Sequence, residues 1–264
     1  MRKGLKIAFV LVVLAIIGIY IVGGGFGEQS MRKEYLSTNT QFAHRGCYGS
    51  LAENSLEGFN KALQLGYQAI ETDVSFTRDK QLILFHDENA KRLLGVDSLI
   101  TDITFNTIKH KPLRFYDRQT KNSVLKLDDF LKTAPKNVKV YLDIKTHSFE
   151  VADSLINLIS RNNYYNQVGI ANSNVVFLSY FKHKDANINT ILEGFNKNKE
   201  WTYTFIPAKY KPDYVASFLK EVDKAHIKWL SKHNMLHRKI VYGVTNQDLL
   251  TVQKFSLKHW IIDP

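Results

Sequence analysis

In the stretch "AIETDVSFTRDKQLILFHD" (residues 69–87), carboxylates interrupt what would otherwise be a buried strand. Glu71 and Asp73 lie two residues apart, so they point to the same side of any strand that contains them. The second apolar run, "QLILF", leads directly into His86 and Asp87. The turn "TRDKQ" between the runs predicts that the chain returns and brings "FHD" to the place where the acidic pair lies.

Outward from this stretch, short apolar runs alternate with helical patterns along residues 41–264. Strands are predicted in "QFAH", "QAIETDV", "QLILFH", "KVYLDIK", "QVGIA", "NINTIL", "DYVASF", "KIVYGV" and "HWIID". Helices are predicted over residues 53–66, 127–132, 152–163 and 222–233. About eight strands with intervening helices predict an α/β fold of the (β/α)8 TIM-barrel type, with a doubly wound sheet as the alternative.

Ionisable residues follow several of these predicted strands. His44 and Arg45 end the first strand, and Asp143 and Lys145 share one face at the end of "YLDIK". Each residue alone has an ordinary explanation, such as a surface hydrogen bond or a local ion pair. In a barrel, however, all of these strand ends meet at one mouth, where burying unpaired charges would cost several kcal/mol each. A bound cation is the economical compensation.

Three of these side chains are carboxylates suited to a hard divalent cation, Ca²⁺ or Mg²⁺: Glu71, Asp73 and Asp143. Zinc, held by histidines with carboxylates, is the alternative, although the sequence contains no helical "HExxH" and no pair of cysteines. His44 and His86 are then available as general acid and base. Arg45 and Lys145 supply positive charge for an anionic substrate.

The N-terminus predicts a membrane segment. Residues 7–26 contain no charged residue, and they follow three basic residues: Arg2, Lys3 and Lys6. That length suffices to cross a bilayer core, and the basic flank favours a cytoplasmic N-terminus with the rest of the chain exported. We expect an uncleaved transmembrane signal anchor over residues 1–27, a linker over 28–40 and one catalytic domain over 41–264. A cleaved signal peptide and a buried soluble helix are the alternatives.

Charge and cysteine content narrow the function classes. The formal net charge of +11 favours contact with anionic lipids or polymers, or reflects only a basic surface. The lysines are spread along the chain without an arginine-rich block or a nucleic-acid module, so we expect no nucleic-acid partner. A single cysteine, Cys47, forms no internal disulfide, and the chemistry predicted nearby needs no thiol nucleophile.

Four motifs carry a resemblance to a known family. "HRG" (44–46), "AENSLEGFNKAL" (52–63), "ETDVSFTRDKQLILFHD" (71–87) and "LDIK" (142–145) resemble the glycerophosphodiester phosphodiesterase family, whose pattern is HRG, PENT, ExD, HD and LEIK. The resemblance extends over residues 41–264, and it is specific in the first half and weaker at "VYGVTN" and "WIIDP". It implies a (β/α)8 barrel of the phosphodiesterase type.

The resemblance also implies roles for single residues. His44 and His86 would be the catalytic acid and base, and a divalent metal ion would be held by three carboxylates: Glu71, Asp73 and Asp143. Arg45, Lys145 and Asn54 would lie at the substrate phosphate. The sequence departs from the family pattern where Asp143 replaces a glutamate, Ala52 a proline and Ser55 a threonine, and its ending lacks the tryptophan of "WTVN" and the threonine of "TD". Asp143 is one methylene shorter than the family's glutamate, which implies a longer or water-bridged third metal contact.

These observations predict an exported, membrane-anchored, metal-dependent hydrolase. Its substrates would be glycerophosphodiesters, either phospholipid headgroup diesters or glycerol-phosphate polymers, and its products glycerol phosphate and an alcohol. A lyase related to phospholipase D or sphingomyelinase D is one alternative. A non-catalytic module that binds anionic lipid or wall polymer is the other.

Overall fold

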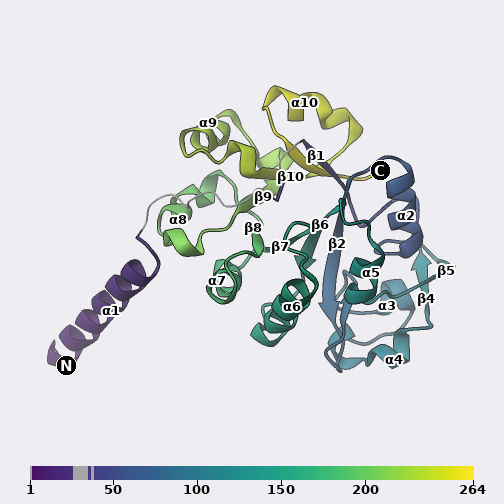
Figure 1. The fold of residues 1–264 in the computed structure, drawn as a ribbon, viewed down its shortest axis with the longest axis horizontal. Helices are drawn as coiled ribbons and strands as arrows, with labels where there is room; N and C mark the ends of the chain where they lie inside the picture. Colours follow the sequence, from purple (N-terminus) through teal and green to yellow (C-terminus); the bar gives the residue numbers. More distant parts are fainter. Residues whose placement is uncertain (1, 26–34, 37–38) are drawn as a thin grey trace.

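The computed structural model describes residues 2–25, 35–36 and 39–264, and in these residues the strands form a barrel (Figure 1). The sheet order is β1-β11-β10-β9-β8-β7-β6-β2-β3, and a further pairing of β1 with β2 closes the ring. The eight barrel strands are β1 (Thr40–Ala43), β2 (Ala69–Phe76), β6 (Lys139–Ile144), β7 (Val168–Asn172), β8 (Asn189–Leu192), β9 (Tyr214–Phe218), β10 (Lys239–Val244) and β11 (His259–Ile262). Their neighbours pair in parallel, so the predicted (β/α)8 barrel is confirmed and the doubly wound alternative is wrong.

One predicted strand lies outside the barrel. β3 (Leu82–Leu84) pairs antiparallel with the end of β2, with Val74 opposite Leu84 and Phe76 opposite Leu82. The turn between β2 and β3 is too short for a parallel crossover, which needs a dozen or more residues. Just after β3, the Phe85 N–H donates to the carbonyl of Asp73 (3.1 Å). The returning strand thus brings His86 back to the level of the acidic pair.

Helices surround the barrel strands (Figure 1). Their bounds are α2 (Leu56–Gln64), α5 (Leu127–Thr133), α6 (Phe149–Asn162), α7 (Val175–Lys184), α8 (Glu200–Thr204), α9 (Lys224–Lys232) and α10 (Leu249–Lys254). The hydroxyl of Ser55 caps α2 by accepting from the Gly58 N–H. Helix α6 begins three residues before its predicted start at residue 152, and α9 begins two residues after its predicted start at residue 222.

Between β3 and α5 the chain forms a small excursion from the barrel. It contains the short helices α3 (Lys91–Leu94) and α4 (Phe105–Ile108) and the hairpin of β4 (Pro112–Phe115) and β5 (Arg118–Ser123). Its buried side chains, among them Leu93, Ile100 and Leu113, pack with Ile83 and Phe85 in a cluster of their own. This cluster fixes the segment that carries His86.

Two residues of the predicted linker lie inside the barrel. Tyr35 and Leu36 are buried with the inward-facing side chains of the strands, while residues 28–34 and 37–38 of that linker lie outside the described part of the chain. The Tyr35 hydroxyl donates to the Val140 carbonyl (2.8 Å), and the Leu36 N–H donates to the Tyr214 hydroxyl (2.9 Å). A Cβ at Gly169 would lie 2.9 Å from the Tyr35 ring. The plug that Tyr35 and Leu36 form in the barrel therefore requires glycine at this position.

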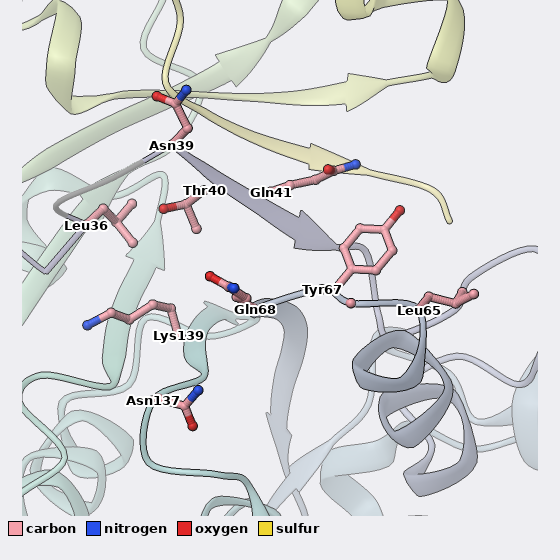
Figure 2. A pocket seen from close by; sticks show the side chains of 10 residues that line it. Leu36, Asn39, Thr40, Gln41, Leu65, Tyr67, Gln68, Asn137 and Lys139 are labelled. Atoms are coloured by element: carbon pink, nitrogen blue, oxygen red, sulfur yellow. The ribbon is translucent and has the colours of Figure 1, made fainter.

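A polar cavity of about 400 Å³ lies at the N-terminal ends of the barrel strands, and Leu36 is among its lining residues (Figure 2). Asn39, Gln68, Asn137 and Lys139 are among the side chains around it. None of its described lining residues is acidic. The cavity is therefore separate from the carboxylates of the opposite end.

The N-terminal helix α1 (Arg2–Val22) projects away from the barrel (Figure 1). Its residues Gly4–Val22 have a mean hydropathy of 2.9 and are not covered by the rest of the chain. By length and composition this helix can cross a membrane.

Candidate active site

The predicted site residues converge at the C-terminal ends of the barrel strands. A cavity of about 360 Å³ is lined by side chains from β2 and from the ends of β1 and β6: His44 and Arg45 follow β1, Glu71 and Asp73 lie within β2, and Asp143 lies near the end of β6. A wider adjoining hollow of about 790 Å³ is lined by His86, Asp87, Arg92 and Lys145, among others. Parallel strands that close into a barrel bring their ends to one mouth, which explains why residues distant in sequence meet here.

Three carboxylates form a cluster in this cavity. One oxygen each of Glu71, Asp73 and Asp143 lies within 4.8 Å of the other two. Asp73 and Asp143 are direct neighbours in the register of β2 with β6. Glu71 and Asp73 are almost fully buried. A set of three carboxylates at this spacing fits a hard divalent cation, which prefers oxygen ligands.

Two basic side chains partly balance this charge. Lys145 forms ion pairs with Asp73 (2.9 Å) and with Asp143. The Arg45 Nε lies 3.0 Å from Asp73, and the Arg45 backbone N–H donates to Glu71 (2.9 Å). The loop conformation behind this contact depends on Gly46, whose φ is +84° and where a Cβ would lie 2.8 Å from the backbone of Gly58.

The pKa values show that the balance is incomplete. Burial and the neighbouring charge of Asp73 raise the pKa of Glu71 to about 7. Burial would also raise the pKa of Asp73, but the attraction of Lys145 and Arg45 outweighs it and lowers that pKa. Burial raises the pKa of Asp143 despite the nearby Lys145. A divalent cation among the three carboxylates would stabilise their ionised forms.

Both predicted histidines are held by a carboxylate at Nδ1. The His44 Nδ1 lies 2.5 Å from Asp263, and the His86 Nδ1 lies 2.8 Å from Asp87. The opposite nitrogen of His44, Nε2, lies 3.9 Å from Glu71. Burial would lower the pKa of His44, but Asp263 and Glu71 reverse the effect and raise it. Such pairing fixes the ring orientation and leaves Nε2 as the ring nitrogen that the carboxylate does not contact.

Arg92 connects the two halves of the site and was not predicted from the sequence. Its guanidinium donates to Asp87 through Nε and Nη2 (both 2.7 Å) and to Glu53 through Nη1 and Nη2 (2.6 and 2.9 Å). Glu53 also accepts from Arg45 (3.0 Å). Glu53, His86 and Asp87 form a second group spaced as metal ligands could be, but Arg92 already pairs with both of its carboxylates. Glu53 lies in the quoted "AENS" motif, whereas no motif marks Arg92.

Asn54 lies behind the carboxylates. Its side-chain carbonyl accepts from the Thr72 hydroxyl (2.6 Å) and the Asp73 N–H (3.2 Å), and its amide donates to Asp73 (2.9 Å). The residue is buried and has a φ of +53°, a conformation that asparagine tolerates. Both ends of the amide are thus bonded to β2, an arrangement that positions Asp73. The predicted phosphate contact of Asn54 stays a prediction.

The far wall of the cavity contains residues that sequence reasoning missed. The Tyr141 hydroxyl donates to Glu193 (2.6 Å), and Phe218 and Tyr242 complete the wall. Burial and the charge of Asp143 raise the pKa of Glu193 to about 8.

Cys47 does not line the cavity. It is buried against Ala43 and Ala62, and burial raises the pKa of its thiol. Its environment is that of a core side chain.

A carboxylate cluster beside two carboxylate-bound histidines at a barrel mouth is typical of metal-assisted acid–base enzymes. Residues 44–238 match the Glycerophosphoryl diester phosphodiesterase family, and the chain belongs to it. It is 26% identical over 170 residues to a lysophospholipase D of Homo sapiens, covering 61% of this chain and 54% of that protein. It is 30% identical over 106 residues to a glycerophosphodiester phosphodiesterase of Bacillus altitudinis, covering 39% and 43%. The chain thus spans about half the length of these relatives.

Solved structures share the fold. A putative glycerophosphoryl diester phosphodiesterase from Silicibacter pomeroyi superposes with a TM-score of 0.74 at 14% identity, covering 86% of this chain and 90% of that one. An Oleispira antarctica phosphodiesterase in complex with the product sn-glycerol-3-phosphate superposes with a TM-score of 0.70 at 16% identity, covering 86% and 93%.

Proposed function

We propose that this chain hydrolyses glycerophosphodiesters to glycerol phosphate and an alcohol with the help of one divalent cation, Ca²⁺ or Mg²⁺. The observation that carries the proposal is the cluster of Glu71, Asp73 and Asp143 within 4.8 Å, next to His44 with its Nδ1 on Asp263. Family membership and the names of the relatives support the reaction class.

Each group then has a chemical role. A cation at the three carboxylates would offset the negative charge that develops on the phosphoryl oxygens. The guanidinium of Arg45 and the ammonium of Lys145, which lie beside those carboxylates, would meet the same oxygens. One histidine would accept the proton of a substrate hydroxyl next to the bridging oxygen, and the other would protonate the leaving alkoxide. Water would then open the resulting cyclic phosphate.

We further propose that residues 1–27 form an uncleaved single-pass signal anchor and that the barrel lies outside the cytoplasmic membrane. The apolar helix α1 and the three basic residues before it support this location. The substrate would accordingly be a lipid headgroup diester or a glycerol-phosphate polymer at the cell surface.

The test compares His44→Asn and His86→Asn with His183→Asn, an exposed histidine on α7. Glycerol phosphate release is measured with glycerophosphocholine, glycerophosphoglycerol and a glycerol-phosphate polymer. We expect the rate of each site variant to fall about 10²- to 10⁴-fold, which is the contribution typical of a general acid or base, and the control to keep the wild-type rate. Full activity in either site variant would refute the assignment. A cyclic phosphate as the end product would instead identify a lyase, and binding without turnover a non-catalytic module.

A further inference from the structure

Helix α8 (Glu200–Thr204) presents two aromatic side chains to the outside of the barrel. Trp201 and Phe205 are each 65% exposed, and their ring centroids are 6.1 Å apart. Large aromatic side chains this exposed, and next to one another, form an apolar patch on the surface. Neither ring lines the active-site cavity.

The segment that follows the apolar helix is bonded to the chain three to four residues after Phe205. The Ala208 N–H donates to the Gly25 carbonyl (2.8 Å), and the Lys209 N–H donates to the Gly23 carbonyl (2.9 Å). The end of α1 is therefore fixed to the chain only a few residues after Phe205. In Figure 1, α1 leaves the barrel on the side where α8 lies, and α10 lies on another side.

Basic side chains border the aromatic pair. Lys199 precedes Trp201, Lys209 follows Phe205, and both lysines are exposed. Aromatic side chains with lysines beside them, at the end of an apolar helix, have the composition of a membrane interface: the rings lie at headgroup level and the lysines near anionic lipid. The apolar helix beside the patch favours a membrane as its partner, because a contact between two copies of the chain would not require such a helix there.

We propose that the α8 strip (Trp201, Phe205, Lys199 and Lys209) lies in the headgroup region of an anionic bilayer and seats the barrel against the membrane. The inference rests on the proposed anchor, but not on the proposed hydrolysis. Because neither aromatic ring lines the active-site cavity, the strip is separate from that cavity. The barrel is thereby held in one orientation by two contacts, the helix α1 and the strip.

The test measures tryptophan fluorescence of the full chain in vesicles of phosphatidylcholine and phosphatidylglycerol, with and without brominated phosphatidylcholine. The signal of Trp201 is the difference between the wild type and Trp201→Phe. A matched control places a tryptophan at an exposed position of α10 by Leu250→Trp in the Trp201→Phe chain. We expect brominated lipid to reduce the Trp201 signal at least twofold and to leave the control within a tenth of its value. Lys199→Glu with Lys209→Glu should reduce this quenching.

Other outcomes would overturn the proposal. Unquenched Trp201 in a chain that resists carbonate extraction would show that the helix is anchored but the strip faces water. A chain that carbonate extracts would refute the anchor and the strip together, whether or not it hydrolyses glycerophosphodiesters. A blue shift of Trp201 that depends on protein concentration, and not on lipid, would assign the strip to a second copy.

Discussion

Replacing Asp263 with Asn tests how His44 is held. The carboxylate lies 2.5 Å from the His44 Nδ1, but about half of the Asp263 side chain is exposed. Solvent screens such a pair, so we expect the loss of its charge to cost about 1 kcal/mol rather than the larger value of a buried pair. That corresponds to a loss of about fivefold in kcat/KM, well below the loss expected for His44→Asn.

The pH profile separates this reasoning from a merely structural role. Asp263 raises the pKa of His44, so Asp263→Asn should lower it and move the corresponding limb of the kcat/KM profile to lower pH. The direction is the same whether His44 acts as acid or as base. Asp248→Asn, which replaces a partly exposed carboxylate bonded to Thr245 and remote in sequence from the site residues, is the control. An unchanged profile, or a loss as large as that of His44→Asn, would contradict the account.

Three further predictions concern stability. Arg92→Ala should lower the free energy of unfolding by about 2 kcal/mol in denaturant titrations, because buried Glu53 then keeps only its contact with Arg45; no change would show that Arg92 does not compensate Glu53. Tyr35→Ala should cost about 3 kcal/mol and Tyr35→Phe about 1, so equal losses would argue against the plug. Metal-free protein should lose stability as pH rises toward 7, because the raised pKa of Glu71 lets the folded state hold a proton that the unfolded state releases. In Glu71→Gln the melting temperature should depend less on pH over this range.

The barrel and half of the site could be predicted because their signals are local. Glu71 and Asp73 stand out within a single apolar run, and strand periodicity puts them on one side. The same holds for Asp143 and Lys145 at the end of β6. Parallel pairing then brings these strand ends together, as the register of Asp73 with Asp143 shows.

The partners that orient the site could not be predicted, because they are distant in sequence. Asp263 lies 219 residues from His44, and Arg92 lies 39 residues from Glu53. Their pairing depends on barrel closure and on the excursion after β3, neither of which leaves a periodic signal. Tyr35 could not be predicted either, because it lies in a polar stretch of the sequence. Its place in the barrel depends on Gly169, where the missing side chain leaves room for the Tyr35 ring. For Asn54, a motif located the residue without showing which atoms its amide contacts.

In the proposed function, Glu71, Asp73 and Asp143 hold a divalent cation that glycerophosphodiester hydrolysis requires. The most direct test is to strip the full chain with chelator, add back Ca²⁺ or Mg²⁺, and measure glycerol phosphate release. Glu71→Gln and Asp143→Asn are measured alongside, with Asp248→Asn as the control. We expect activity to be lost completely and reversibly in chelator, and both site variants to need a cation concentration at least about tenfold higher for activation. Full activity in excess chelator would contradict it.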